Sequence, residues 1–220
     1  MTCLVAGCSD PSVREANLIK ENRPVAAFAE VTWSNGAKHG PARITLPNGS
    51  TKEGNFVGGK KEGIWVWRSA TGDTIGTTAY SAGKLHGWLV ERNGHVNVRE
   101  ARYDNGIANG PRITRYPDGH PASLVWFIEG HEHGPAWFWN QRDTVNIGKL
   151  IKGQYEHGTI AGTWRRYYGD GVLCNENNFA NGVRHGIWTL WDRNGIVLRQ
   201  VEFRNDKLVR TIVHRVPKTN

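Results

Sequence analysis

The sequence predicts an all-β protein, an elongated antiparallel meander of about seven stacked β-hairpin repeats after a short N-terminal segment. Three features of the sequence predict it: an aromatic residue recurs every 23 to 24 residues, a glycine follows it at a fixed distance, and a second glycine follows that one. Composition agrees, because 27 glycines and 10 tryptophans in 220 residues exceed the usual content of a soluble domain. Glycine-containing turns and aromatic side chains are therefore expected to recur along the chain.

The first residues resemble the cleavage site of a bacterial lipoprotein. Leu4-Val5-Ala6-Gly7 precede Cys8, and the polar stretch Ser9-Asp10-Pro11-Ser12 follows it. A complete signal needs a basic region and about 7–15 apolar residues, more than stands before Cys8. The resemblance therefore implies a truncated lipoprotein signal over residues 1–8, lipidation of Cys8, and a protein anchored by lipid to the bacterial cell envelope. The alternative is the frayed apolar N-terminus of a cytoplasmic protein.

Residues 9–28 are expected to form a linker in front of the repeats. The stretch is polar and contains prolines. A weak helical periodicity from Ser12 to Glu21 is the only helical signal in the chain.

The repeat array is expected over residues 29–213, with a tail at 214–220. Its aromatic position recurs at steps of 23, 24, 23, 24, 24, 28 and 24 residues when Ile151 fills the one gap. The copies are Trp33, Phe56, Tyr80, Tyr103, Phe127, Ile151, Phe179 and Phe203. Such a period indicates supersecondary units that bury their apolar faces by stacking on their neighbours.

A glycine keeps the same period seven residues after the aromatic, and Arg210 takes its place in the last copy. The glycines are Gly40, Gly63, Gly87, Gly110, Gly134, Gly158 and Gly186. A second glycine, usually after Asn or Asp, stands at Gly49, Gly72, Gly94, Gly119, Gly171 and Gly195. The fifth unit departs, because Asp143 occupies this second position. An insertion of four residues is expected near residues 155–162, so that Gly162 rather than Gly158 opens the sixth unit.

Each unit is expected to hold two short strands and two glycine-containing turns. Asn-Gly or Asp-Gly between alternating apolar residues predicts a β-hairpin, because both turn positions favour positive φ. Trp65 and Trp67 show the period-two alternation of a half-buried strand. The predicted structural positions are the turn glycines and the strand tryptophans, namely Gly40, Gly63, Gly87, Gly110, Gly134, Gly186, Trp65, Trp164 and Trp188.

Three units resemble a known repeat, the variant MORN repeat (membrane occupation and recognition nexus), which in bacteria is often labelled YwqK-type antitoxin. The resemblance is carried by Gly186-Ile187-Trp188 with Phe203, by Gly63-Ile64-Trp65 with Tyr80, and by Gly162-Thr163-Trp164 with Phe179. It covers about Trp33 to Arg210. It implies an antiparallel hairpin array that serves lipid contact, scaffolding or toxin neutralisation, and it carries over no catalytic residue. Gly110-Pro111-Arg112 lacks the usual tryptophan.

The histidines and cysteines predict no metal site. Five histidines precede a repeat glycine and are interpreted as one structural position: His39, His86, His133, His157 and His185. Neighbouring copies would lie about 10 Å apart, two strand spacings, which is too far to share a zinc ion. His131 and His133 form the only close pair, and adventitious metal binding is the alternative there. Cys3, Cys8 and Cys174 match no zinc or disulfide pattern, so no metal or cofactor is expected, and Cys174 should pack as a small apolar residue.

The sequence indicates a protein that is not an enzyme. It contains no nucleophile elbow, and no spacing selects a pair of carboxylates. Gly58-Gly59-Lys60-Lys61 lacks the rest of a phosphate-binding loop.

The charge pattern favours an acidic partner. Lys and Arg number 28 against 20 Asp and Glu, for a net charge of +8, and the excess concentrates after Asn181. The predicted contacts are Arg165, Arg166, Arg184, Arg193, Arg204 and Arg210. The expected partner is a protein or an anionic lipid or polymer surface. Nucleic acid is not favoured, because the repeat already explains the aromatic residues beside the arginines, and the oligomeric state stays open.

Two functional hypotheses follow. The leading one is a non-catalytic repeat protein for binding or scaffolding, associated with the cell envelope through Cys8 and recognising a protein or an anionic surface. The alternative is a cytosolic antitoxin or immunity protein that binds and neutralises a cognate toxin.

Overall fold

The computed structural model describes residues 12–16, 28–140 and 150–214. Within these ranges every regular secondary-structure element is a β-strand, and no helix is found. The chain divides into two compact units, residues 1–107 and 108–220. The predicted all-β class and the antiparallel hairpin meander are confirmed. Cys8, Asp143 and residues 215–220 of the predicted tail lie outside the described residues.

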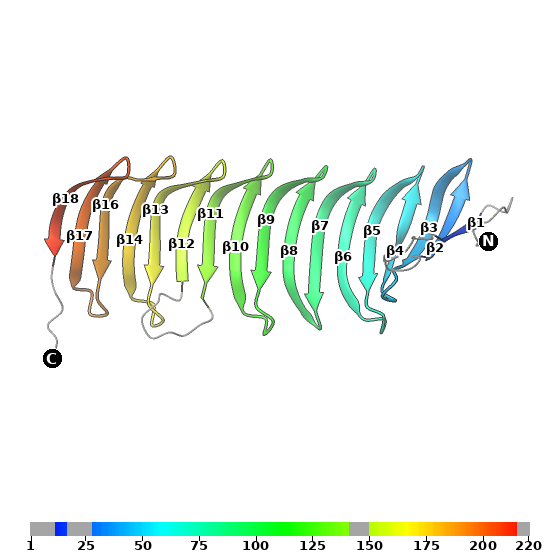
Figure 1. Cartoon of the computed structure of the whole chain (residues 1–220), viewed down its shortest axis with the longest axis horizontal. Coiled ribbons are helices and arrows are strands. Elements are labelled where there is room, and N and C mark those ends of the chain that lie inside the picture. Colours follow the sequence, from blue (N-terminus) through cyan, green and yellow to red (C-terminus); the bar gives the residue numbers. More distant parts are fainter. Residues whose placement is uncertain (1–11, 17–27, 141–149, 215–220) are drawn as a thin grey trace, which may run out of the picture. The chain divides into compact units, whose positions relative to one another are not determined.

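The first unit is an antiparallel meander in which each strand pairs with the next strand of the chain (Figure 1). Its strands are β1 (Ser12–Ala16), β2 (Phe28–Ser34), β3 (Ala37–Thr45), β4 (Thr51–Val57), β5 (Lys60–Arg68), β6 (Thr74–Ser81), β7 (Lys84–Asn93) and β8 (Val96–Asp104).

β1 lies inside the segment predicted as a linker. It pairs with β2 from Ser12 opposite Thr32 to Ala16 opposite Phe28. The helix that the weak periodicity indicated is therefore not formed by Ser12–Ala16, which is a strand. A helix this short is marginal in water, whereas the edge of β2 offers a row of backbone donors and acceptors that a strand can satisfy.

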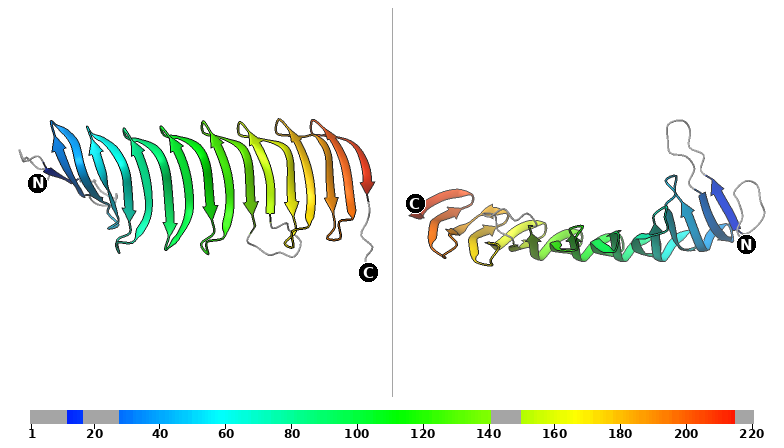
Figure 2. Two further views of the ribbon diagram at one scale, coloured as in Figure 1. Left: turned by 180° about the vertical axis from the view of Figure 1, so that it is seen from behind. Right: turned by 90° about the horizontal axis from the view of Figure 1, so that it is seen from below.

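The second unit is a meander of the same kind, formed as a single layer of strands (Figure 2). Here β15 and β16 both pair with β14 and act as one interrupted strand. The strands are β9 (Ile107–Arg115), β10 (Pro121–Ile128), β11 (His131–Trp139), β12 (Leu150–Glu156), β13 (Thr159–Tyr167), β14 (Leu173–Ala180), β15 (Val183–Arg184), β16 (Gly186–Trp191), β17 (Val197–Arg204) and β18 (Lys207–His214).

The tight hairpin turns lie just after the repeat aromatic, for example between β2 and β3. A glycine-containing loop, not a tight turn, was predicted there. Asn35 has φ 50° and Gly36 has φ 76°, which is the pair of positive values that a type I′ turn needs. The same pattern recurs at Gly58-Gly59, Ala82-Gly83, Asn105-Gly106, Glu129-Gly130, His157-Gly158, Asn181-Gly182 and Asn205-Asp206.

The Asn-Gly and Asp-Gly pairs that were predicted as tight turns mostly lie in longer turns at the other strand ends. Only the glycine has positive φ there, as at Gly49 and Gly119. The preceding side chain has another role: the Asn48 and Asp118 oxygens accept hydrogen bonds from the backbone N–H two residues later, at 3.1 and 3.0 Å. These are side-chain turns of the kind that Asn and Asp favour, so the dipeptide predicts a turn correctly but not its type.

Apart from Gly158, which lies in the tight turn between β12 and β13, the repeat glycines lie within or at the start of strands. Their prediction as turn residues is therefore wrong, although their φ is positive. Gly40, with φ 91°, lies in β3 where the β2–β3 register shifts between Val31 and Trp33. Equivalent shifts accompany Gly63, Gly87, Gly134 and Gly162. Each of these five hairpins thus carries a β-bulge, a kink for which glycine provides the left-handed backbone conformation.

The aromatic position of the sixth unit is Tyr155, and its assignment to Ile151 is wrong. Tyr155 pairs with Gly134 as Phe179 pairs with Gly162. Gly162 lies seven residues after Tyr155, so Gly162 rather than Gly158 holds the repeat-glycine position, as predicted. The additional residues therefore fall between Trp139 and Leu150 rather than near residues 155–162. The repeat aromatics of the described chain are Trp33, Phe56, Tyr80, Tyr103, Phe127, Tyr155, Phe179 and Phe203.

Within each unit the repeat aromatics lie on one face of the sheet, here called the aromatic face. In the first unit the buried cluster is formed by Ala29, Val31, Ala42, Phe56 and Trp65. In the second unit it is formed by Val125, Phe127 and Ala136, with Phe138, Tyr155 and Trp164 packed against it. The core is therefore a ladder of side chains on one side of a sheet, which is consistent with aromatic cross-strand pairs as the unit of stabilisation.

Large and small residues complement each other across neighbouring strands of the aromatic face. A Cβ placed on Gly54 would lie 2.4 Å from the Trp65 ring, and one placed on Gly153 would lie 2.1 Å from the Trp164 ring. Where valine replaces glycine, the opposite residue is small, as in the directly paired Val125 and Ala136. Cross-strand volume is thus conserved while the residues change.

Candidate binding site

Strands β12 to β17 place polar and aromatic side chains in neighbouring rungs on the aromatic face of the second unit. Trp164 of β13 pairs with Asn177 of β14. A second row of paired residues runs across the same strands. Arg166 of β13 pairs with Asn175 of β14, Asn175 pairs with Leu190 of β16, and Leu190 pairs with Arg199 of β17. Because alternate residues of a strand point to the same face, these side chains share one surface although they come from four strands.

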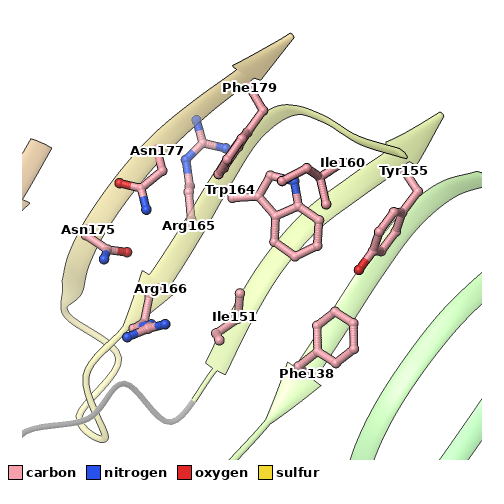
Figure 3. A pocket seen from close by; sticks show the side chains of 10 residues that line it. All are labelled: Phe138, Ile151, Tyr155, Ile160, Trp164, Arg165, Arg166, Asn175, Asn177 and Phe179. Carbon is pink, nitrogen blue, oxygen red and sulfur yellow. The ribbon is translucent and has the colours of Figure 1, made fainter. Parts of the chain in front are cut away.

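The first of two hollows on this surface, the Trp164 hollow, has a volume of about 280 Å³. Figure 3 shows Phe138, Tyr155 and Trp164 on one side of it. The Tyr155 ring stands perpendicular to the Trp164 ring at an interplanar angle of 85°, whereas Phe138 is nearly parallel to it at 21°. Burial, with a further contribution from Glu132, raises the pKa of Tyr155, so its hydroxyl stays neutral at physiological pH.

The polar side of the Trp164 hollow is formed by Arg165, Arg166, Asn175 and Asn177 (Figure 3). The same two asparagines line a second hollow of about 320 Å³, the Trp188 hollow, together with Arg184 and Arg199. The two hollows therefore lie side by side on either side of β14.

No carboxylate lines either hollow. Arg184 also lies over the Phe203 ring, 4.4 Å from its centroid. Its charge is balanced by Asp206 at 3.0 Å, and the hydrogen bonds from the Arg184 backbone and side chain hold the pKa of Asp206 below its ordinary range. Among the described residues, Arg166 and Arg199 have no acidic partner. The surface is therefore electropositive and suited to an anionic group.

The six arginines predicted to bind an acidic partner fall into different environments. Four of them are in ion pairs: Arg165 with Glu176, Arg184 with Asp206, Arg193 with Asp170, and Arg210 with Glu202. Arg204 is exposed on the last hairpin, and Arg166 lines the Trp164 hollow.

Arg199, Asn175 and Asn177 line the hollows, although no sequence pattern predicted them as site residues. Arg199 belongs to the excess of basic residues after Asn181, but nothing in the sequence separated it from the other arginines there. No signal selected the asparagines, because their role depends on which strands flank β14.

The histidines do not all share one position. His157 is the first residue of a tight turn, with φ 47°, and its ring lies 4.9 Å from the His133 ring, centroid to centroid. Its interpretation as a copy of the position before the bulge glycine is therefore wrong. Within residues 28–140 and 150–214, no group of three metal-binding side chains is found.

Two further predictions concern the cysteines and the membrane. Cys174 is a free, buried cysteine and packs as a small apolar residue, as expected. In the part of the chain that the structure describes, no helix is long and apolar enough to cross a membrane.

Comparison with known sequence families supports the repeat. Residues 161–181 and 184–205 match the family described as MORN repeat variant, so two consecutive copies extend from β13 to β17, and they include Trp164 and Trp188. Repeats of this family are generally binding or scaffold repeats. A comparison with curated proteins gives no match.

Proposed function

We propose that the chain is a non-catalytic binding or scaffold protein that holds an acidic partner on the aromatic face of its second unit. The partner is a protein with exposed carboxylates or an anionic surface. The observation that carries the proposal is the composition of the two hollows, in which Arg166, Arg199 and two asparagine amides meet aromatic rings without any carboxylate. Aromatic and arginine side chains are also the residues that dominate binding energy at interfaces.

Neutralising Arg166 and Arg199 tests this proposal. The double variant Arg166→Gln/Arg199→Gln should bind poly-L-glutamate, vesicles rich in phosphatidylglycerol or polygalacturonate at least about tenfold more weakly, because a hydrogen bond to a charged group contributes about 1.5–3 kcal/mol. Its affinity should also depend less on salt, since fewer charges are screened. Binding is measured by titration calorimetry at two salt concentrations.

The matched control is Arg102→Gln/Arg204→Gln, which removes the same charge from two exposed positions outside the hollows. It should leave the affinity of the anionic probe nearly unchanged. Equal losses in the two variants would mean that net charge, rather than the hollows, attracts the partner.

We also propose that Cys8 tethers the protein to the bacterial cell envelope. The support is the sequence Leu4-Val5-Ala6-Gly7-Cys8 with the polar residues after it. Lipid chains contribute about 0.8 kcal/mol per buried CH₂, and more than one chain gives a stable anchor. Wild-type protein expressed with its upstream sequence should therefore sediment with membranes in high salt, and Cys8→Ser should not. Protein recovered from the cytosol with Met1 intact would instead favour the antitoxin alternative.

A further inference from the structure

The Trp164 indole provides a flat surface at the floor of its hollow. A Cβ on Gly153 would lie 2.1, 2.3 and 2.6 Å from the Cδ2, Cε2 and Cε3 atoms of this ring. One face of the indole therefore rests directly on the β12 backbone, and the other faces away from the sheet. Phe138 extends the surface, with ring centroids 6.2 Å apart and planes 21° from parallel, and both rings are seen side by side in Figure 3.

A second indole continues this surface across the strands. Trp188 of β16 is separated from Trp164 of β13 by β14 alone, so the two strands are two spacings, about 10 Å, apart. Asn177 pairs with Trp164 and lies between the tryptophan strands. A ligand that uses both indoles must be extended, must run across the strands, and must place hydroxyl or amide groups between two flat apolar patches.

The polar groups beside the indoles indicate hydroxyls and carboxylates in that ligand. Within the described residues, the amides of Asn175 and Asn177 make no side-chain hydrogen bond. Each amide can both donate and accept, as adjacent sugar hydroxyls require. Arg166 and Arg199 lie three strand spacings, about 14 Å, apart, and a guanidinium binds a carboxylate through two parallel hydrogen bonds.

We propose that the ligand of this surface is an acidic polysaccharide built from uronic acids, with sugar rings on Trp164 and Trp188, hydroxyls on the two asparagines, and carboxylates on Arg166 and Arg199. This inference rests on the proposed function and names its partner. Both indoles are half-buried, and the apolar C–H faces of a pyranose ring match the outward face of such an indole by dispersion contact. The distance between the two indole-bearing strands suits an extended disaccharide unit.

Two other extended polymers fit the surface less well. A peptide gains affinity on a sheet mainly by adding a strand to an open edge, whereas β13, β14, β16 and β17 are each paired on both sides. Nucleic acid gains affinity by neutralising a row of phosphates, whereas this surface offers two arginines without an acidic partner, separated by neutral side chains.

The experiment compares oligogalacturonate with its methyl ester, which has the same sugar rings and hydroxyls without the charge. Titration calorimetry should show the acid form binding at least tenfold more tightly to the wild type. Arg166→Gln/Arg199→Gln should abolish this preference and retain weak binding of the ester. Asn177→Asp should weaken acid binding at least tenfold, because it adds a carboxylate without changing side-chain shape, and Asn55→Asp, on an exposed position of β4, should have no effect.

The outcomes separate this inference from the proposed function. Binding of poly-L-glutamate or anionic vesicles that depends on the two arginines, without a preference for oligogalacturonate, would overturn the polysaccharide and leave the acidic-partner function standing. Tighter binding of single-stranded DNA than of oligogalacturonate would also overturn it. Failure of every acidic probe would reject both proposals.

Discussion

Replacing Gly153 with valine should destabilise the second unit by about 3 kcal/mol, at the upper end of the cost of overpacking a core. The new Cβ would overlap the Trp164 ring, which now lies 2.1 Å from that position, so the indole could no longer rest on the β12 backbone. The indole must then leave the aromatic face, and its contacts with Phe138 and Tyr155 are lost. Denaturant unfolding followed by tryptophan fluorescence measures the loss.

A second substitution should compensate for the first. Trp164→Ala alone creates a cavity and should cost about 3–5 kcal/mol. Gly153→Val/Trp164→Ala recreates the pair that Val125 and Ala136 form between β10 and β11, where both residues are buried. The double variant should therefore be more stable than the sum of the two single losses predicts, by a coupling of about 2 kcal/mol.

Gln154→Val is the matched control for the valine, because it places the same side chain on the neighbouring exposed position of β12. It should leave the free energy of unfolding within about 0.5 kcal/mol of the wild type.

Strict additivity in the double variant Gly153→Val/Trp164→Ala would show that Gly153 and Trp164 are not packed against each other.

Replacing Gly186 with valine should lower the free energy of unfolding by about 1–3 kcal/mol through backbone strain alone. Gly186 has φ 76° at the interruption between β15 and β16, a conformation that β-branched residues rarely adopt. Gly195→Val, also at φ 76° with no neighbouring atom within 4 Å, isolates the strain from any steric clash and should cost a similar amount.

His185→Ala is the control for these glycine variants. The backbone N–H of His185 donates to the Asn178 carbonyl oxygen at 3.0 Å, and that bond survives loss of the imidazole. Thermal melts should therefore show His185→Ala close to the wild type. A loss as large as that of Gly195→Val would give the histidine a structural role that the strain argument does not provide.

The local order of the chain could be predicted from the sequence because it depends on nearby residues. Asn48-Gly49 and Asp118-Gly119 belong to the dipeptides that favour turns, so the alternation of strand and turn could be predicted from them. The aromatic period, together with the repeat glycines, predicted that the hairpins stack. Even the sixth unit could be placed in part, since Gly162-Thr163-Trp164 keeps the motif after the spacing changes.

The bulges and the turn types could not be predicted from the same patterns. A glycine with positive φ is required both in a tight turn and in a strand bulge, so Gly40 and Gly36 look equivalent in the sequence. The strand register distinguishes them: Trp33 pairs with Lys38 and Val31 with Ala42, so Gly40 lies in the bulge between these two pairs, whereas Gly36 lies in the turn. The same ambiguity led to the misassignment of His157 and of the aromatic position at Ile151.

An array of antiparallel β-hairpins with structural aromatics and an excess of positive charge follows from the repeat pattern and the composition of the chain. Where that charge is available to a partner depends on how the strands pair. Arg165 and Arg166 are adjacent in sequence and both line the Trp164 hollow, yet Arg165 is paired with Glu176, whereas Arg166 has no acidic partner among the described residues. The reason is the register of two separate strands, which places Glu176 of β14 opposite Arg165 and the neutral Asn175 opposite Arg166.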